Sequence, residues 1–434
     1  MSEFFSSDAI RRIFMSTISL ISFPIKLKLS LQRVFHRLLK TIIAVALSLC
    51  FALPVEAQNL ERPVRIGVLS DMSSIYSSIG GRGLIDAARM AVEDFGGTVN
   101  GRRVEILFFD TENKVDLATA KARQWFDVDG VEMITDLPTS GIAIAVSQLA
   151  RQKKKIIMIT SAGTSDLTGK DCSPYAVHWT YDTYALSVGT ARALVRAGGD
   201  SWFFVSAGLS FGEALERDAS DVIRAEGGKV LGGVRHAFGA PDFSSPILQA
   251  LQAKAKVIGL ANAGQDMIAS VKQAREFGLH QNETRIAALL AFITDIKGLG
   301  LERAQGLFLT EAFYWDLNEE TRQWSRRFHK RNGSMPTMNQ AGTYGAVIHY
   351  LKSVQKTNNH DADVVMKQLK ALPVNDFMTI NGTIREDGRV LRDMYLFQVK
   401  TPIESIRDWD FYKLVTPIPA ESAFRPLSQG ACVF

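Results

Sequence analysis

The sequence has no excess of charge of one sign once its N-terminal segment is set aside. Its 434 residues include 50 Lys and Arg against 45 Asp and Glu, a net charge of +5. The first 57 residues hold seven of these basic residues and three of the acidic ones, which leaves 43 against 42 in the rest. Nucleic-acid-binding proteins present clustered Lys and Arg, so this balance gives no argument for a nucleic-acid partner.

The sequence also lacks an apolar run long enough to cross a bilayer comfortably. The run at 41–53 is well short of the roughly 20 residues that a transmembrane helix needs. Basic residues such as Arg37 and Lys40 precede it, and a short segment that ends at Ala57 follows it. This order is typical of a signal peptide over residues 1–57 and predicts cleavage near Ala57 and an exported protein. A retained N-terminal anchor is the alternative.

Cysteine is scarce. Of three cysteines, Cys50 lies in the predicted signal peptide, which leaves Cys172 and Cys432. An even pair in an oxidising compartment allows a disulfide. It would close a long loop and stabilise the fold by up to roughly 5 kcal/mol. Two unpaired thiols are the alternative.

Clusters that bind metals or nucleotides are missing as well. His and Cys residues nowhere show the spacing of metal ligands. The glycine-rich segment 80–83 follows a predicted strand, but Asp86 stands where a dinucleotide-binding turn needs its third glycine. We therefore expect no metal and no bound cofactor.

Short apolar runs alternate with helical patterns along most of the chain. The apolar runs predict strands at 65–69, 104–109, 132–135, 156–160, 202–206, 229–235, 257–261, 286–290 and 306–310. A 3.6-residue periodicity predicts helices at 83–95, 117–126, 143–152, 184–197, 211–226 and 266–277. Continuous apolar strands between helices indicate an α/β fold with parallel sheets covered on both faces. The alternation fills two blocks, 63–180 and 184–310, each the size of one doubly wound domain.

After residue 310 the pattern changes. Helices are predicted at 319–330, 340–357 and 361–372, followed by strands near 378–385 and 390–399. The intervening segment 386–389 contains Asp-Gly, which favours a tight hairpin turn.

The segment 65–95 reads as a buried strand, a Ser- and Gly-rich turn and an amphipathic helix. Such a turn directs backbone N–H groups into the crevice at the carboxyl edge of a sheet, where an anion can bind. The segment therefore favours a protein that holds a small anionic ligand.

Five segments carry a resemblance to a known family. They are SDMSSIYSSIGGRG from Ser70, IIMITSAGTSDLTG from Ile156, HWTYDTYAL from His178, FGEALERD from Phe211 and VKQAREFGL from Val271. In their order and spacing, the chain resembles the periplasmic substrate-binding proteins of ABC importers, in the leucine/isoleucine/valine-binding branch (type I). The likeness covers essentially the whole chain after the predicted signal peptide.

The resemblance implies two Rossmann-like lobes with parallel sheets, joined by three crossings and closing over a ligand by hinge motion. The crossings would lie near 181–183, 310–312 and 385–388. One lobe would comprise 63–181 with 312–385, and the other 182–311 with 386–434. The resemblance also implies a disulfide between Cys172 and Cys432.

Two turns of the first lobe match those that hold the ligand carboxylate in this family. They contain Ser140 and Gly141 in one turn, and Ala162, Gly163 and Thr164 in the other. Each turn leaves a strand and enters a helix, where free N–H groups and the helix dipole favour an anion. Ordinary helix capping by these hydroxyl residues is the alternative.

Further contacts follow from the same match. Tyr76, Phe211 and Phe292 would wall the cleft, and Asn262 with Ala263 would close on the ligand after the strand at 257–261. Trp179 approaches the first crossing. Core packing is the alternative for each aromatic residue.

The chain departs from the family at one informative place. Amino-acid binders keep an acidic residue after the strand near 286–290, to pair with the ligand ammonium, and here 287–292 contains none. Asp295 is the nearest acid, so a shifted match stays open. Because a buried ammonium without a carboxylate is costly, we expect an aromatic or other apolar acid, with a branched-chain amino acid as the alternative.

The resemblance implies a monomeric, non-enzymatic solute-binding protein whose partners are a small carboxylate or amino acid and an inner-membrane ABC permease. A ligand-sensing receptor module of the same fold is one alternative. The other is a secreted serine α/β-hydrolase, since residues 208–212 fit G-x-S-x-G between a strand and a helix. It would use Ser210 with Asp316 and either His349 or His360.

Overall fold

The computed structural model describes residues 62–279 and 284–433. The predicted signal peptide and its cleavage near Ala57 lie outside the described residues and stay predictions. Within the described ranges, no helix is long and apolar enough to cross a membrane.

Six strands form the first sheet, in the order β2-β3-β1-β4-β5-β6. Their bounds are β1 Val64–Ser70, β2 Thr98–Val99, β3 Arg102–Asp110, β4 Val131–Asp136, β5 Ile156–Ile159 and β6 Ala176–His178. All neighbours are parallel except β2 and β3. Helices α3 (Gly81–Phe95), α4 (Val115–Asp127) and α5 (Ser140–Lys153) connect them. Val64, Ile66 and Val68 face a core with α3, whereas Leu69 faces a second core with α4 and α5, so both sheet faces are covered.

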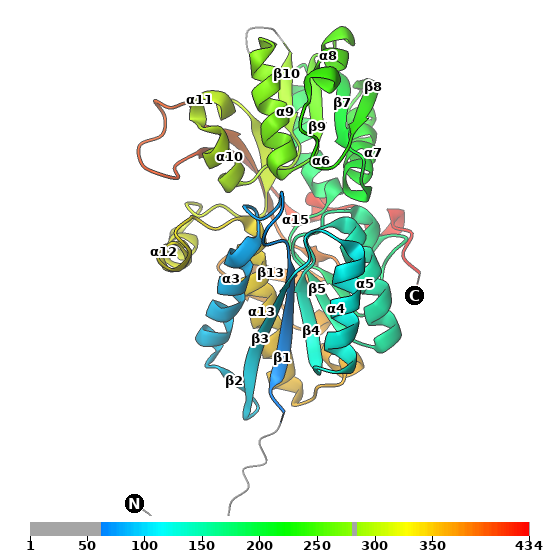
Figure 1. Ribbon diagram of the computed structural model, residues 1–434, viewed down its shortest axis with the longest axis vertical. Helices are drawn as coiled ribbons and strands as arrows, with labels where there is room; N and C mark the ends of the chain where they lie inside the picture. The colour runs from blue at the N-terminus through cyan, green and yellow to red at the C-terminus, as the bar shows by residue number, and fades with distance from the viewer. Residues whose placement is uncertain (1–61, 280–283, 434) are drawn as a thin grey trace, which may run out of the picture. The chain divides into compact units, whose positions relative to one another are not determined.

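Seven strands form the second sheet, in the order β16-β15-β11-β10-β9-β7-β8. Four of them, β10, β9, β7 and β8, are labelled near the top of Figure 1. Their bounds are β7 Ser201–Ala207, β8 Lys229–His236, β9 Val257–Ala261, β10 Arg285–Ala288, β11 Phe308–Glu311, β15 Met394–Val399 and β16 Tyr412–Ile418. Strands β7 to β11 are parallel, and β15 and β16 add an antiparallel edge. The helices are α6 Thr183–Arg196, α7 Ser210–Ala225, α8 Ser244–Gln252, α9 Gly264–Glu276, α10 Ile293–Leu299 and α11 Leu301–Ala304.

The later part of the chain adds helices α12 (Glu319–Asn332), α13 (Met338–Thr357) and α14 (Ala362–Ala371), and a short helix α15 (Ala420–Ala423). Helix α13 packs against α3 of the first sheet. Strands β12 (Val374–Asp376), β13 (Thr379–Ile384) and β14 (Val390–Leu391) form a small antiparallel sheet. The α/β class with two parallel-dominated sheets is therefore confirmed.

The predicted hairpin forms, but the predicted strand at 390–399 is wrong as a single strand. It is divided into β14, which pairs with β13, and β15, which pairs with β11 of the second sheet. The chain therefore passes from the small sheet to the second sheet at Arg392 and Asp393. The reason is local: the His178 N–H donates to the Gly388 carbonyl at 2.9 Å, which holds the hairpin turn beside β6. The division of the chain into two lobes at the ranges given above stays a prediction.

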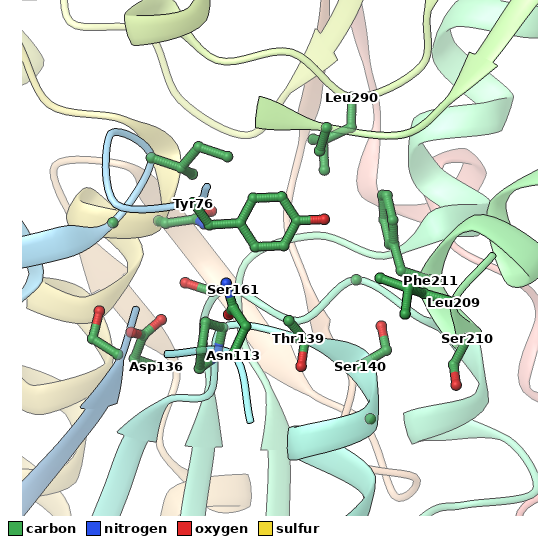
Figure 2. Close-up of a pocket in the computed structure, with 18 of the residues that line it drawn as sticks. Tyr76, Asn113, Asp136, Thr139, Ser140, Ser161, Leu209, Ser210, Phe211 and Leu290 are labelled. Atoms are coloured by element: carbon green, nitrogen blue, oxygen red, sulfur yellow. The ribbon is translucent and has the colours of Figure 1, made fainter. Parts of the chain in front are cut away.

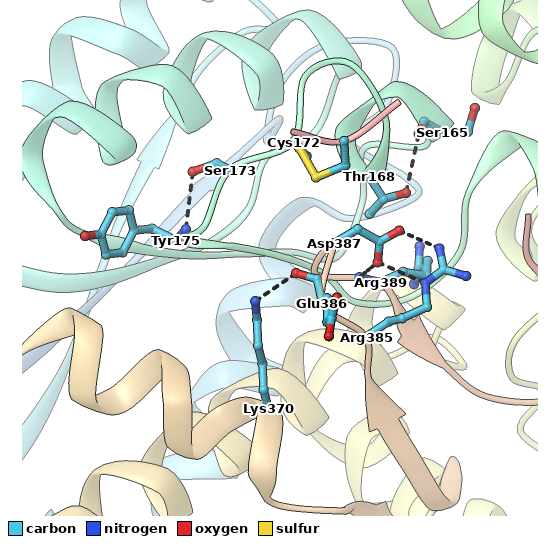
Figure 3. Close-up of a disulfide and its surroundings, with 11 residues drawn as sticks. Ser165, Thr168, Cys172, Ser173, Tyr175, Lys370, Arg385, Glu386, Asp387 and Arg389 are labelled. Carbon is cyan, nitrogen blue, oxygen red and sulfur yellow. Dashed lines mark hydrogen bonds and ion pairs between the residues drawn. A yellow bond between two sulfur atoms is a disulfide. The ribbon is translucent and has the colours of Figure 1, made fainter. Parts of the chain in front are cut away.

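The predicted disulfide is present between Cys172 and Cys432, whose Cα atoms are 5.6 Å apart (Figure 3). Cys172 lies between the short helix η1 (Ser165–Thr168) and β6, whereas Cys432 follows η3 (Leu427–Gln429), beyond the last strand of the second sheet. The bond therefore links the C-terminal tail to a loop of the first sheet, across 260 positions in sequence.

Candidate functional site

A cavity of about 140 Å³ lies where loops that follow strands of both sheets meet (Figure 2). Two groups of side chains face it. We call the first the polar wall; it comprises Ser70, Asn113, Asp136, Thr139, Ser140, Ser161 and Asn339. We call the second the apolar wall; it comprises Leu209, Phe211, Phe238, Ala263, Leu290 and Phe292. Tyr76 extends over the polar wall in Figure 2.

The polar wall follows from the direction of the parallel strands. Ser70 and Asp136 are the last residues of β1 and β4, and Ser161 comes just after β5. The carboxyl ends of neighbouring parallel strands meet at one edge of a sheet, where open α/β folds bind ligands. Side chains that are 25 to 91 positions apart in sequence are therefore neighbours in the cavity.

The first predicted anion turn lines the cavity at the start of α5. Ser140 is its first helical residue and Gly141 the second, and Thr139 accepts the Ile142 N–H as the N-cap. The Ser140 Oγ accepts the Thr164 N–H at 3.2 Å, which ties the two predicted turns together. The free N–H groups of this first turn and the positive end of the helix favour an anion here.

Only one residue of the second predicted turn lines the cavity. That residue is Gly163. Thr164 is fully buried, and its Oγ1 accepts the Asp166 N–H, so it caps η1 as the capping alternative supposed. The Ala162 carbonyl accepts a hydrogen bond from His178 Nε2 at 2.8 Å. Ala162 and Thr164 therefore support the turn from behind, outside the group of residues that line the cavity.

Gly163 has a steric role. A Cβ at this position would lie 2.9 Å from Cε2 of Phe211 and 3.1 Å from Cε2 of Tyr181. Real Cβ atoms hardly ever approach another atom that closely, so the missing side chain is what lets Phe211 of α7 lie against the turn of the first sheet.

Tyr76, Phe211, Ala263 and Phe292 line the cavity as expected. The Tyr76 ring meets that of Phe238 edge to face, with centroids 5.4 Å apart. Its loop is held by Asp71, whose Oδ2 accepts the Tyr76 N–H at 2.8 Å. Burial raises the pKa of Tyr76, and the carboxylates of Asp266, Asp295 and Asp71 raise it further. The phenol therefore stays neutral and can donate or accept a hydrogen bond.

Two of the predicted contacts lie outside the cavity lining. Trp179 is fully buried and packs against the His349 ring at 5.4 Å between centroids, as the core-packing alternative supposed. Asn262 is buried too, and its Nδ2 donates to Ser270 Oγ at 3.0 Å and to His236 Nε2 at 3.1 Å. Both side chains stabilise the structure around the site.

Asp136 is the residue that sequence reasoning missed. It is fully buried in the polar wall, and neither carboxylate oxygen has a hydrogen-bond partner. Burial raises its pKa to about 7, with a further increase from Asp71, while the nearby hydroxyls of Ser161 and Ser70 act in the opposite direction. Asp136 and Leu137 have φ of 78° and 65°, a strained conformation for side chains of this size. Such strain and such a pKa are typical of functional sites.

Asp295, the shifted match for the missing acid, has a structural role. Its Oδ2 accepts the Phe292 N–H at 3.0 Å and caps α10. Burial raises its pKa to about 7. It lies outside the residues that line the cavity.

The residues of the hydrolase alternative have other partners. Ser210 is exposed at the start of α7. His349 hydrogen-bonds the Leu369 carbonyl at 3.0 Å, and His360 hydrogen-bonds Glu132 at 2.7 Å. Asp316 pairs with Arg322 at 2.6 Å. Over residues 62–279 and 284–433, none of the three hydrogen-bonds Ser210, and no group of His, Cys, Asp and Glu side chains is placed to hold a metal ion.

Comparison with known proteins supports this architecture. The family model of the periplasmic binding proteins matches residues 63–404. A periplasmic binding protein from Burkholderia mallei is 46% identical, with a TM-score of 0.83 over 85% of this chain and 98% of its own. A branched-chain amino acid ABC transporter periplasmic ligand-binding protein from Burkholderia xenovorans is 37% identical, with a TM-score of 0.78 over 85% of this chain and 99% of its own.

More distant structures share the fold. A solute-binding protein from Rhodopseudomonas palustris, solved in complex with 4-hydroxybenzoate, is 19% identical, with a TM-score of 0.75 over 82% of this chain and 97% of its own. No curated protein matches the sequence. The family match and the two Burkholderia structures confirm the resemblance: this chain belongs to the type I periplasmic binding proteins of ABC transporters.

Proposed function

We propose that this protein is the extracytoplasmic solute-binding component of an ABC importer, and that it captures a small carboxylate with an aromatic or other apolar body. The observation that carries the proposal is the pairing of the α5 N-terminus, at Ser140 and Gly141, with the apolar wall across one cavity. The first suits a carboxylate. The second suits a ring or a branched alkyl group.

The size of the cavity supports a ligand of this kind. Its volume of about 140 Å³ is close to that of the engineered cavity of about 150 Å³ that binds benzene. Benzoate-like acids and branched-chain amino acids both have bodies of this size. The relatives support the same two classes, since one is a branched-chain amino acid binder and another was solved with 4-hydroxybenzoate.

Capture would work by a shift in population between open and closed arrangements of the two lobes. A ligand that contacts both walls gains its full binding energy only in the closed arrangement, so it stabilises that arrangement. The exported protein would then present the closed form to an inner-membrane permease, act as a monomer and carry out no reaction. Ser140, Gly141 and Gly163 would hold the carboxylate, with Tyr76, Phe211, Ala263 and Phe292 around the apolar body.

Calorimetric titration of the purified protein with benzoate, 4-hydroxybenzoate, leucine and 4-methylpentanoate tests the proposal. We expect at least one of these acids to bind, and Ser140→Ala to weaken that binding by about 10- to 100-fold, the value of one hydrogen bond to a charged group. Thr164→Val is the matched control, because it removes a hydroxyl of the neighbouring turn that lies outside the cavity lining. No binding of any acid contradicts the proposal, and equal losses in both variants contradict the placement of the carboxylate.

A further inference from the structure

Six buried polar atoms of the polar wall lack a hydrogen-bond partner within the described residues. Ser70 Oγ, Asn113 Oδ1, Ser161 Oγ, Asn339 Oδ1 and both carboxylate oxygens of Asp136 are buried without a hydrogen-bond partner. Native proteins leave only a few such atoms in every hundred residues, and each is costly. Because these atoms lie around one cavity, we expect a group of the ligand to form hydrogen bonds with them.

Most of these atoms can only accept a hydrogen bond. Asn113 uses its amide nitrogen elsewhere, donating to Asp71 Oδ2 at 2.6 Å and to Ser74 Oγ at 2.8 Å, which leaves its oxygen on the cavity side. An ionised Asp136 has only acceptors. The Ser70 and Ser161 hydroxyls can turn toward Asp136 and donate to it, which leaves its other lone pairs and the two amide oxygens as acceptors. The missing group is therefore a hydrogen-bond donor.

The charges lead to the same conclusion. Among the described residues that line the cavity, Asp136 is the only one with a carboxyl side chain, and none is Lys, Arg or His. A ligand that brought only a carboxylate would add a second negative charge to a site of low dielectric, where like charges repel strongly. A hydrogen bond from a donor group on the same ligand would stabilise the Asp136 carboxylate and offset part of this repulsion.

The two ends of the polar wall are separate in space. Figure 2 shows Asp136 at one end, Ser140 at the other, and Ser161 and Thr139 between them, with Tyr76 above. A ligand that lies along this wall can therefore contact both ends with different groups.

We propose that Asp136, together with the amide oxygens of Asn113 and Asn339, forms a second polar subsite that accepts hydrogen bonds from an amino or hydroxyl group of the ligand. This inference rests on the proposed function, which places the ligand carboxylate at Ser140. It makes Asp136 the residue that selects among acids of similar size, by the presence of a donor group in addition to the carboxylate.

Matched pairs of ligands test the subsite. Leucine and 4-methylpentanoate differ by an amino group, and 4-hydroxybenzoate and benzoate differ by a hydroxyl group. We expect the wild-type protein to prefer the donor-bearing member of one pair by at least tenfold in calorimetric titration. The pair that shows this preference identifies the donor as amino or hydroxyl. In Asp136→Ala the two members of that pair should bind with Kd values within about twofold of each other.

Two further variants make the result decisive. Asp295→Asn alters a second buried carboxylate with a raised pKa that lies outside the cavity lining, and it should leave the ratio unchanged. Asp136→Asn keeps the size of the side chain, so it serves if the alanine variant does not fold. Binding of these acids with the same pair ratio in wild-type and Asp136 variants overturns the subsite alone. Failure of all four acids to bind wild-type protein overturns the proposed function, and the subsite with it.

Discussion

The two walls of the cavity recognise a ligand in different ways. The polar wall comes from the ends of first-sheet strands and from α13, and it keeps unpaired acceptors and a strained backbone at Asp136. The apolar wall comes from the second sheet, where Phe211, Leu290 and Phe292 are also part of a continuous hydrophobic core. The polar wall therefore distinguishes the hydrogen-bonding groups of a ligand and lowers the stability of the fold. The apolar wall is complementary to the shape of a ligand and stabilises the fold. Changes in the two walls should consequently separate affinity from selectivity.

The largest effect that we expect is on stability and comes from Asp136→Asn. The folded protein holds the pKa of Asp136 near 7 instead of its usual 3.8, so ionisation is penalised in the folded state. Stability from this group is fully present below pH 4, falls as the pH rises to 7, and above that is lower by on the order of 4 kcal/mol. The Asn variant should therefore exceed wild type in unfolding free energy at pH 8, and by much less at pH 5. Urea denaturation of the ligand-free proteins measures both differences.

The same stability difference at pH 5 and pH 8 would show that Asp136 is not the group responsible. A gain in stability that coincides with loss of the preference within a ligand pair would support the division between the walls, because natural sites commonly give up stability for function.

The second effect concerns the contact between the walls. Gly163→Ala places a methyl group 2.9 Å from the Phe211 ring, and overpacking of this kind costs 1 to 3 kcal/mol. We expect ligand affinity to fall by up to about 100-fold while the folded state persists. Because the shortest approach is to Phe211 and Tyr181 is slightly farther away, the double variant with Phe211→Leu should recover part of the affinity. An equal loss in single and double variants would place the obstruction elsewhere.

A smaller effect is expected from Phe211→Ala alone. Phe211 is 7% exposed, and losing part of its contact with an apolar ligand should weaken binding by about 10-fold. The loss of affinity should be the same for both members of a ligand pair, because the Phe211 ring contacts the apolar body of the ligand and not its donor group. Calorimetric titration of this variant gives the Kd values of benzoate and 4-hydroxybenzoate. A change in the ratio of these Kd values as large as that in Asp136→Ala would contradict the assignment of Phe211 to the apolar wall.

The smallest effect is expected from Ser210→Ala. Ser210 borders the cavity beside Phe211, but its side chain is exposed to solvent, so removing the hydroxyl should change affinity by less than about twofold. The same variant tests the hydrolase alternative. Hydrolysis of a p-nitrophenyl ester by wild type that disappears in Ser210→Ala would revive that alternative.

Most of the fold could be predicted because its strands are continuous apolar runs. All nine predicted strands of the two main sheets are present, with ends displaced by at most two residues. Strands β2 and β6 have only two and three residues and helix α8 nine, too few to show a period. The break between β14 and β15 did have a signal, because Arg392 and Asp393 interrupt the apolar run.

The site was less predictable, since it depends on the direction of single side chains. The strand-to-helix pattern located Ser140 and Gly163, but it could not separate them from Thr164, which is directed to the cap of η1. Trp179 and Asn262 are one or two residues from positions that line the cavity, and both are directed away from it. Asp136 was missed because its exposure to the cavity depends on a left-handed backbone at the end of β4, which a sequence of Asp and Leu does not suggest.

The disulfide between Cys172 and Cys432 has a consequence for motion. It joins a loop of the first sheet to the tail that follows the second sheet. The 260 positions between the two cysteines therefore form a covalently closed loop that includes the whole second sheet. The bond restricts how far the tail can move from the first sheet, whether or not a ligand is bound. The disulfide therefore keeps the tail beside the first sheet, and the segment between β16 and Cys432 has to accommodate any movement between the two sheets.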